Sequence, residues 1–119
     1  MPGTITRTEL AEAIAAKAVV VLEALPSSYF EAEHLPGALN LPLDNLDELA
    51  PVLVPDKSAA VVTYCANTSC NNSAMAAERL RAIGYTDVRA YEGGKQDWVE
   101  AGLPFENGAT VGQVRPQPR

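Results

Sequence analysis

The sequence predicts an α/β domain with a mostly parallel central sheet and helices on both faces. Two observations carry this prediction: continuous apolar, β-branched runs recur along the chain, and segments with helical spacing and capping residues alternate with them. Such runs are typical of strands buried on both faces, and regular alternation with helices is typical of parallel sheets. A third observation sets the size, because 119 residues with 47% hydrophobic composition suit one domain with its own core.

The overall charge and hydropathy narrow the classes of partner. Fifteen acidic residues against nine lysines and arginines give a net charge of −6, which argues against broad attraction to nucleic acid or to anionic membranes. No apolar run reaches the length of a membrane span, and the N-terminus lacks the order of a secretory signal. We therefore expect a cytoplasmic protein whose partners are small molecules or other proteins.

The first predicted elements are a helix and a buried strand. Thr6 and Glu9 have the spacing of a capping box, and residues 10–17 continue with good helix formers. Residues 18–25 form a β-branched apolar run that ends at Pro26, so they predict a central parallel strand.

Short elements follow the first strand. Residues 27–33 predict a short helix, and residues 34–42 predict a turn that leads into a short strand. Asp44 is expected to cap a brief helix over residues 45–50, which Pro51 closes.

A second buried strand and a longer helix occupy the middle of the chain. Residues 58–65 form another continuous apolar run, and Asn72 or Ser73 is expected to cap the helix over residues 73–83. Gly84 suits the C-terminal cap of this helix. Its apolar positions keep helical spacing: Ala74, Ala77, Leu80 and Ile83.

The last predicted elements complete the alternation. Residues 87–91 predict a third clear strand and residues 93–102 a short helix that begins at glycines. We assign residues 4–106 to the domain. Residues 107–119 are polar, contain proline and end in basic residues, so we expect a flexible tail.

The chemistry of the chain is expected at Cys65, where the strand over residues 58–65 ends. Ligands of open parallel sheets bind at the carboxyl ends of the strands. The loop after Cys65 leads to a helix N-terminus, whose backbone N–H groups and dipole would lower the pKa of the thiol and would also hold a persulfide or sulfonate. The loop lacks Lys and Arg, so further positive charge would come from a more distant group such as Lys95. The expected substrate-binding loop is Ala66, Asn67, Thr68, Ser69, Cys70 and Asn71.

Other roles for the two cysteines remain open at this point. Cys65 and Cys70 could be ordinary buried residues, since cysteine is often buried. His34 is the only histidine, so a zinc site would need carboxylates or a second chain, and we expect neither a metal nor a cofactor. A phosphatase-like loop would need an arginine six residues after its cysteine, where Asn71 and Ala76 stand instead.

Three segments in this order resemble rhodanese-like domains. Residues 34–42, HLPGALNLP, are similar to the H-x-P-G-A-x-N-x-P segment of that family. The strand VVTYC, its loop and the Ser-Ala-rich helix resemble the family's active-site region, and residues 91–104 resemble its G-G-x-x-x-W region. The resemblance spans about residues 4–106.

This resemblance implies a sulfurtransferase with a parallel sheet of about five strands. It makes Cys65 the carrier of sulfane sulfur as a persulfide, cradled by the backbone of residues 66–71, with Cys70 as an accessory or resolving thiol. The remaining matches fall on framework positions, for which we expect structural roles: His34, Gly37, Asn40, Gly93, Gly94 and Trp98. Gly37 and the pair Gly93 and Gly94 suit turns that need positive φ.

The chain departs from the family pattern in two places. Family members commonly have Asp-x-Arg after the first central strand, where this chain has Glu23, Ala24 and Leu25. The active-site loop is about two residues longer than is common, contains Cys70 and lacks a basic residue. These departures bear on thiosulfate activity more than on the fold.

Three functions compete. The first is transfer of sulfane sulfur from thiosulfate or a persulfide to a thiol, cyanide or an acceptor protein through a Cys65 persulfide. The second is a redox protein in which Cys70 resolves a sulfenate or persulfide on Cys65 and forms a disulfide. The third is a non-catalytic binding module on the same fold. The thiol retained at the catalytic place argues against the binding module. We rank sulfur transfer first, the redox function second and the binding module third.

Overall fold

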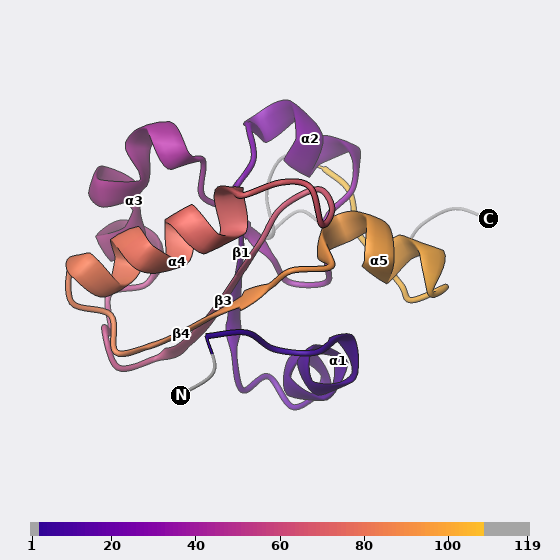
Figure 1. The fold of residues 1–119 in the computed structure, drawn as a ribbon, viewed down its shortest axis with the longest axis horizontal. Coiled ribbons are helices and arrows are strands. Elements are labelled where there is room, and N and C mark those ends of the chain that lie inside the picture. Colours follow the sequence, from indigo (N-terminus) through magenta and orange to yellow (C-terminus); the bar gives the residue numbers. More distant parts are fainter. Residues whose placement is uncertain (1–2, 109–119) are drawn as a thin grey trace.

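The computed structural model describes residues 3–108 and confirms the predicted α/β fold with a parallel sheet (Figure 1). Strands and helices alternate along the chain. In order, the elements are α1 (Arg7–Ala15), β1 (Val20–Glu23), α2 (Ser27–Ala32), β2 (Leu39–Asn40), η1 (Leu43–Asn45), α3 (Leu46–Leu53), β3 (Ala60–Tyr64), α4 (Asn72–Ala82), β4 (Asp87–Tyr91) and α5 (Gly94–Glu100).

The sheet is parallel throughout, with the strand order β2-β1-β3-β4. β1 and β3 lie in its centre, and the residue pair Glu23 and Tyr64 ends their shared ladder. The chain before α1 adds an isolated parallel bridge at the β4 edge, where Thr4 pairs with Ala90. The sheet therefore has four strands, and this bridge lies beyond β4 where a fifth strand would be added.

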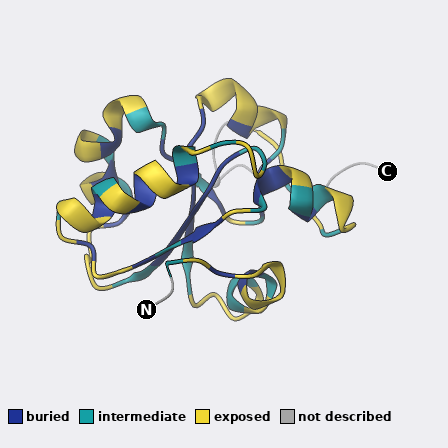
Figure 2. Cartoon of the chain, in the orientation of Figure 1, coloured by how far each residue is buried: buried dark blue, intermediate teal, exposed yellow. Residues whose placement is uncertain are grey.

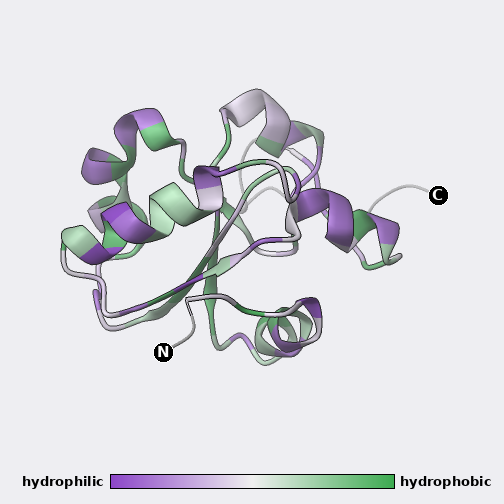
Figure 3. Cartoon of the chain, viewed as in Figure 1, coloured by the Kyte–Doolittle hydropathy of each residue, from purple (hydrophilic) through white to green (hydrophobic). Residues whose placement is uncertain are grey.

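Two apolar clusters cover the two faces of the sheet. Successive strand residues alternate between them: Leu22 and Val61 belong to the cluster with α3 and α4, whereas Val21 and Val62 belong to the cluster with α1, α2 and α5. The strands are therefore buried on both sides, while the outer surfaces of the helices are exposed (Figure 2). Figure 3 shows the same division, with β1 largely hydrophobic and α5 largely hydrophilic.

Two helix boundaries follow the sequence signals. The capping box of α1 is present, because the Thr6 amide donates to Glu9 Oε1 at 3.0 Å and the Glu9 amide donates to Thr6 Oγ1 at 3.1 Å. Gly84 follows α4 with φ of +112°, and the Gly84 amide donates to the Arg81 carbonyl. Both predictions are confirmed.

The predicted ends of α3 were wrong. Asp44 lies inside the 3-10 turn η1, and α3 begins after Asn45 without a side-chain cap. Pro51 lies within α3 rather than closing it. Pro51 has no N–H to donate to the Asp47 carbonyl, but only that one bond is lost, and the Val54 amide still donates to the Ala50 carbonyl at 2.8 Å.

The predicted cap of α4 was also wrong, and one of its apolar positions lies outside the buried face. Asn71 is the N-cap and makes no side-chain capping bond, while the Asn72 side chain donates to the Ala24 carbonyl at 2.9 Å. Ala74 is exposed, because the helix turns a different set of residues toward the sheet. The buried face consists of Ser73, Ala76, Ala77 and Leu80.

Within residues 3–108, no helix combines the length and the apolar character needed to cross a membrane. The tail predicted over residues 107–119 lies, from residue 109 onward, outside the described residues.

Candidate functional site

Cys65 directly follows β3, at the carboxyl edge of the parallel sheet. Its side chain is almost fully buried, with 1% of the residue exposed. The neighbouring strand ends beside it, since the Ala24 amide donates to the Tyr64 carbonyl at 2.9 Å. The cysteine expected at the ligand-binding edge therefore lies there.

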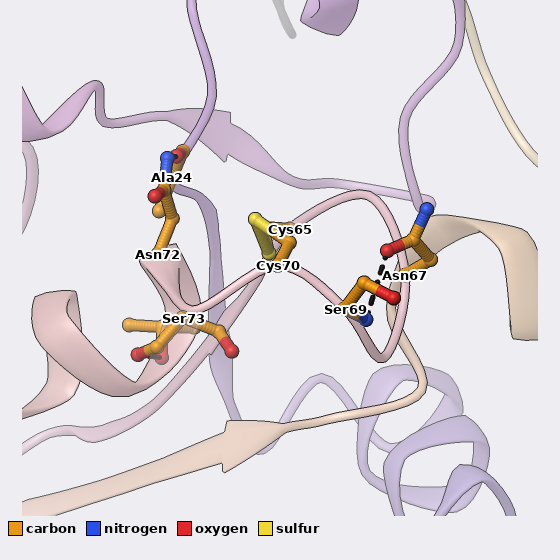
Figure 4. The surroundings of a disulfide bond; sticks show 8 residues. Ala24, Cys65, Asn67, Ser69, Cys70, Asn72 and Ser73 are labelled. Carbon is orange, nitrogen blue, oxygen red and sulfur yellow. Dashed lines mark hydrogen bonds between the residues drawn. A yellow bond between two sulfur atoms is a disulfide. The ribbon is translucent and has the colours of Figure 1, made fainter.

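Cys65 and Cys70 form a disulfide, with their Cα atoms 6.4 Å apart (Figure 4). Cys70 is half-buried, in contrast to Cys65. The loop thus brings together the two cysteines, whose pairing the sequence left undecided. In this oxidised form neither sulfur is a free thiol, so reduction must precede any chemistry that uses a thiolate.

Asn67 organises the loop between the two cysteines. Its side-chain oxygen accepts from the Ser69 amide at 3.0 Å (Figure 4). Its carbonyl accepts from the Cys70 amide at 3.1 Å. An asparagine that bonds to the backbone two residues later forms a local turn. Two of the amides expected to cradle the sulfur therefore donate to Asn67 in the disulfide form. Thr68 and Asn71, the other polar residues of the loop, are exposed.

The start of α5 holds the Cys65 end of the loop. The Lys95 amide donates to the Cys65 carbonyl and the Gln96 amide donates to the Ala66 carbonyl, both at 2.8 Å. Gly94 has φ of +71°, and a Cβ atom there would lie 2.7 Å from the Cys65 carbonyl oxygen. Only glycine fits this position without strain.

Gly93 differs from the expectation that both glycines of the pair need positive φ. Its φ is −63°, in the ordinary helical range. A Cβ atom there would instead lie 2.8 Å from the Asp97 Cβ atom, so a side chain is excluded by the following turn. The reason for glycine is steric contact rather than backbone conformation.

A buried polar network lies behind Cys65, and the sequence reasoning missed it. Lys95 Nζ donates to Glu23 Oε2 at 3.0 Å and to the Tyr29 carbonyl at 2.8 Å. The Tyr64 hydroxyl donates to Glu23 Oε1 at 2.6 Å and accepts from the Leu35 amide at 3.1 Å. Glu23 is fully buried and Lys95 is 8% exposed. The available signal was a carboxylate within an apolar strand, which needs a partner when buried.

The burial of this network shifts the pKa values of its acids. Burial raises the pKa of the Glu23 carboxyl, although the hydrogen bond from Tyr64 and the charge of Lys95 act in the opposite direction. Burial also raises the pKa of the Tyr64 hydroxyl well above its usual value, and the nearby Glu23 carboxylate raises it further. Tyr64 therefore acts as a neutral hydrogen-bond donor.

A cavity of about 320 Å³ opens next to the loop, between α2 and α5. It reaches the site at Ala66, the residue after Cys65, and Lys95 lines it as well. Its volume suits a small molecule. The lining residues are Leu25, Tyr29, Glu33, Ala66, Lys95, Gln96, Val99 and Glu100.

The framework residues make structural contacts away from the sulfur atoms. His34 is buried, stacks on Phe30 at 3.8 Å between ring centroids and places Nδ1 2.8 Å from the Phe30 carbonyl. Asn40 donates to the Leu25 carbonyl at 2.8 Å, and Trp98 Nε1 donates to the Pro104 carbonyl at 2.7 Å. Gly37 has φ of +73°.

No group of three His, Cys, Asp or Glu side chains within residues 3–108 is arranged to hold a metal ion.

Comparison with known proteins matches this geometry to one family. The model of the rhodanese-like domain family matches residues 6–101. A helix-turn-helix transcriptional regulator, Rv0324 of Mycobacterium tuberculosis, is 33% identical over 108 residues, which cover 91% of this chain and 46% of the regulator. The thiosulfate sulfurtransferase PspE of Escherichia coli is 39% identical over 64 residues, covering 54% of this chain and 59% of that protein. The chain thus spans about half the length of these curated relatives.

The match to one solved structure extends over the whole length of the solved chain. The structure described as a rhodanese with anions from Escherichia coli is 32% identical, with a TM-score of 0.64, and the match covers 76% of this chain and 100% of that one.

Proposed function

Since the chain belongs to the rhodanese-like domain family, we propose that it transfers sulfane sulfur from thiosulfate or a persulfide to a thiophilic acceptor through a persulfide on Cys65. One observation carries the proposal: Cys65 is fixed at the carboxyl end of β3 by backbone bonds from α5, at the start of the loop that leads into α4. The related thiosulfate sulfurtransferase PspE supports the donor class.

The first half-reaction loads the carrier. After reduction of the disulfide, the Cys65 thiolate attacks the sulfane sulfur of thiosulfate. A new S–S bond forms at Cys65 Sγ, the S–S bond of thiosulfate breaks, and sulfite leaves with the bonding electron pair. The outer sulfur would carry negative charge. The helix dipole of α4 and the loop amides other than those that donate to Asn67 would stabilise this charge.

The second half-reaction unloads the carrier. A thiolate or cyanide attacks the outer sulfur, takes it up and returns the bonding electrons to Cys65 as thiolate. The cavity beside Ala66 supports a small donor or acceptor. The net charge of −6 favours a basic surface on any acceptor protein. A cytoplasmic setting would keep the two thiols reduced between cycles.

The disulfide favours a second candidate function. In that function the Cys65–Cys70 pair exchanges electrons with an external dithiol or disulfide and carries no sulfur. Both cysteines are required for such exchange, whereas sulfur transfer to an external acceptor requires only Cys65.

The test is thiocyanate formation from thiosulfate and cyanide by the pre-reduced protein. Wild type and Cys70→Ser are expected to form thiocyanate and, without cyanide, sulfite, whereas Cys65→Ser should fall to the uncatalysed rate. Retained activity in Cys65→Ser would refute the assigned carrier. Inactivity of all three proteins together with disulfide exchange by wild type would support the second candidate.

A further inference from the structure

We propose that the same site has a second activity, in which Cys70 attacks the Cys65 persulfide and releases hydrogen sulfide. This inference rests on the proposed function, because it needs a persulfide on Cys65. The product state of the reaction on the protein is the internal disulfide that the structure contains. The chain would then reduce sulfane sulfur as well as transfer it.

The loop geometry places Cys70 where this attack requires it. The Cys65–Cys70 bond demonstrates that the segment between them closes with the two Sγ atoms in contact. Closure does not depend on that bond alone, because Asn67 accepts from the amides of both Ser69 and Cys70. A nucleophile held in such a position acts at an effective concentration far above that of a free thiol.

Contacts outside the loop hold both of its flanks. On the Cys65 side, the amides of Lys95 and Gln96 bind the first two carbonyls of the loop. On the far side, Asn72 at the start of α4 binds the Ala24 carbonyl, and Figure 4 shows Ala24 and Asn72 on the opposite side of the disulfide from Asn67. The span between the cysteines is therefore set by β1, α4 and α5 together.

Access to the two sulfur atoms of the persulfide separates the two activities. In the disulfide form Cys65 is 1% exposed, and the segment that carries Cys70 must move aside before a donor reaches Cys65 Sγ. Once the persulfide has formed, its outer sulfur stands between Cys65 Sγ and an external acceptor, which is therefore expected to attack the outer sulfur. Cys70 instead contacts Cys65 Sγ directly. Attack on the outer atom transfers sulfur, whereas attack on the inner atom expels it.

The reaction balances without a further reactant. The Cys70 thiolate attacks Cys65 Sγ, the Sγ–Sγ bond forms, and the bond from Cys65 Sγ to the outer sulfur breaks. The outer sulfur leaves with the bonding electrons and takes up the proton that the Cys70 thiol lost, so that it is released as hydrosulfide. The two cysteines supply the two electrons that reduce sulfane sulfur to sulfide. With thiosulfate as donor, one round gives sulfite, hydrosulfide and the disulfide, and an external dithiol must reduce the disulfide before the next round.

A single-turnover experiment tests this inference. Fully reduced protein, freed of reductant and kept anaerobic, receives one equivalent of thiosulfate, after which sulfite, sulfide and intact mass are measured. Wild type is expected to give about one sulfite and one sulfide per chain and to lose two hydrogens. Cys70→Ser should give sulfite, gain one sulfur atom in mass and release no sulfide until a thiol is added.

Matched variants secure the interpretation. Val52→Ala changes an exposed side chain of α3, outside the loop, keeps both thiols and should behave as wild type. Cys70→Ala should repeat the result of Cys70→Ser. Sulfite with a stable persulfide on wild type would overturn sulfide release and leave the proposed function intact. Absence of sulfite from every variant would overturn both, and sulfide release by Cys70→Ser would show that Cys70 is not the resolving thiol.

Discussion

The two ends of the active-site loop are held in different ways. The Cys65 end continues a central strand, is buried, and is bound by α5 and backed by the network of Glu23, Tyr64 and Lys95. The Cys70 end is half-buried among exposed residues and is held by the local turn at Asn67 and by the disulfide. Figure 2 shows this change from buried to exposed along the loop.

This difference suggests a division of roles between the two thiols. A carrier needs a fixed position, so that donor and acceptor reach one atom in one geometry. A resolving thiol must instead leave the carrier while sulfur is loaded and return afterwards, which a lightly held segment permits. Changes at the Cys65 end should therefore affect stability and transfer together, whereas changes at the Cys70 end should affect sulfide release with little effect on stability.

The largest effect on stability is expected for Lys95→Met. This change leaves the buried Glu23 carboxylate without its cation, and loss of one partner of a buried ion pair costs about 3–5 kcal/mol. Denaturant unfolding should show the loss. The double variant Glu23→Gln, Lys95→Met should recover much of it, and equal stabilities for the single and double variants would argue against a role for the charge.

A smaller loss is expected for Gly94→Ala, with Gly102→Ala as its control. Both glycines have positive φ, +71° and +80°, so both substitutions carry the backbone strain of roughly 1–3 kcal/mol. A Cβ atom at Gly94 would also lie within 3 Å of the loop backbone, whereas one at Gly102 would have no neighbour within 4 Å. Thiocyanate formation should fall in Gly94→Ala alone; equal activity in the two variants would contradict the contact between α5 and the loop.

The smallest change in stability is expected for Asn67→Ala. It removes one side-chain hydrogen bond in a half-buried loop, worth about 0.5–1.5 kcal/mol. Transfer to cyanide should remain close to wild type, because the Cys65 end is held from α5. Single-turnover sulfide release should slow, because the turn that brings Cys70 back is weakened, and an unchanged rate of release would refute this role of Asn67.

The fold and the place of Cys65 could be predicted because both depend on local patterns. The apolar run over residues 58–65 predicts a buried strand, and a cysteine at its end lies at the ligand-binding edge of any parallel sheet. The pairing with Cys70 could not be decided, since the spacing permits closure but Asn67 and the flanking elements bring it about. Asn72 shows the same limit, because its side chain binds Ala24 instead of capping its own helix.

The buried ion pair was beyond sequence reasoning for a different reason. Glu23 and Lys95 are 72 residues apart along the chain, and α5 carries its lysine to the end of β1 only in the folded domain. Helix capping and strand patterns describe neighbours in sequence and contain no information about this contact.

The position of Lys95 also bears on how this family can vary. The usual pattern carries an arginine two residues after the first-strand carboxylate, where this chain has Leu25, and the cation that meets Glu23 comes from α5. The cation beside Glu23 therefore need not lie on the segment that follows β1, because α5 provides it here. Leu25 is thereby free to line the cavity with an apolar side chain. A cation at residue 25 in place of Lys95 would keep this interior neutral but would make that wall of the cavity charged.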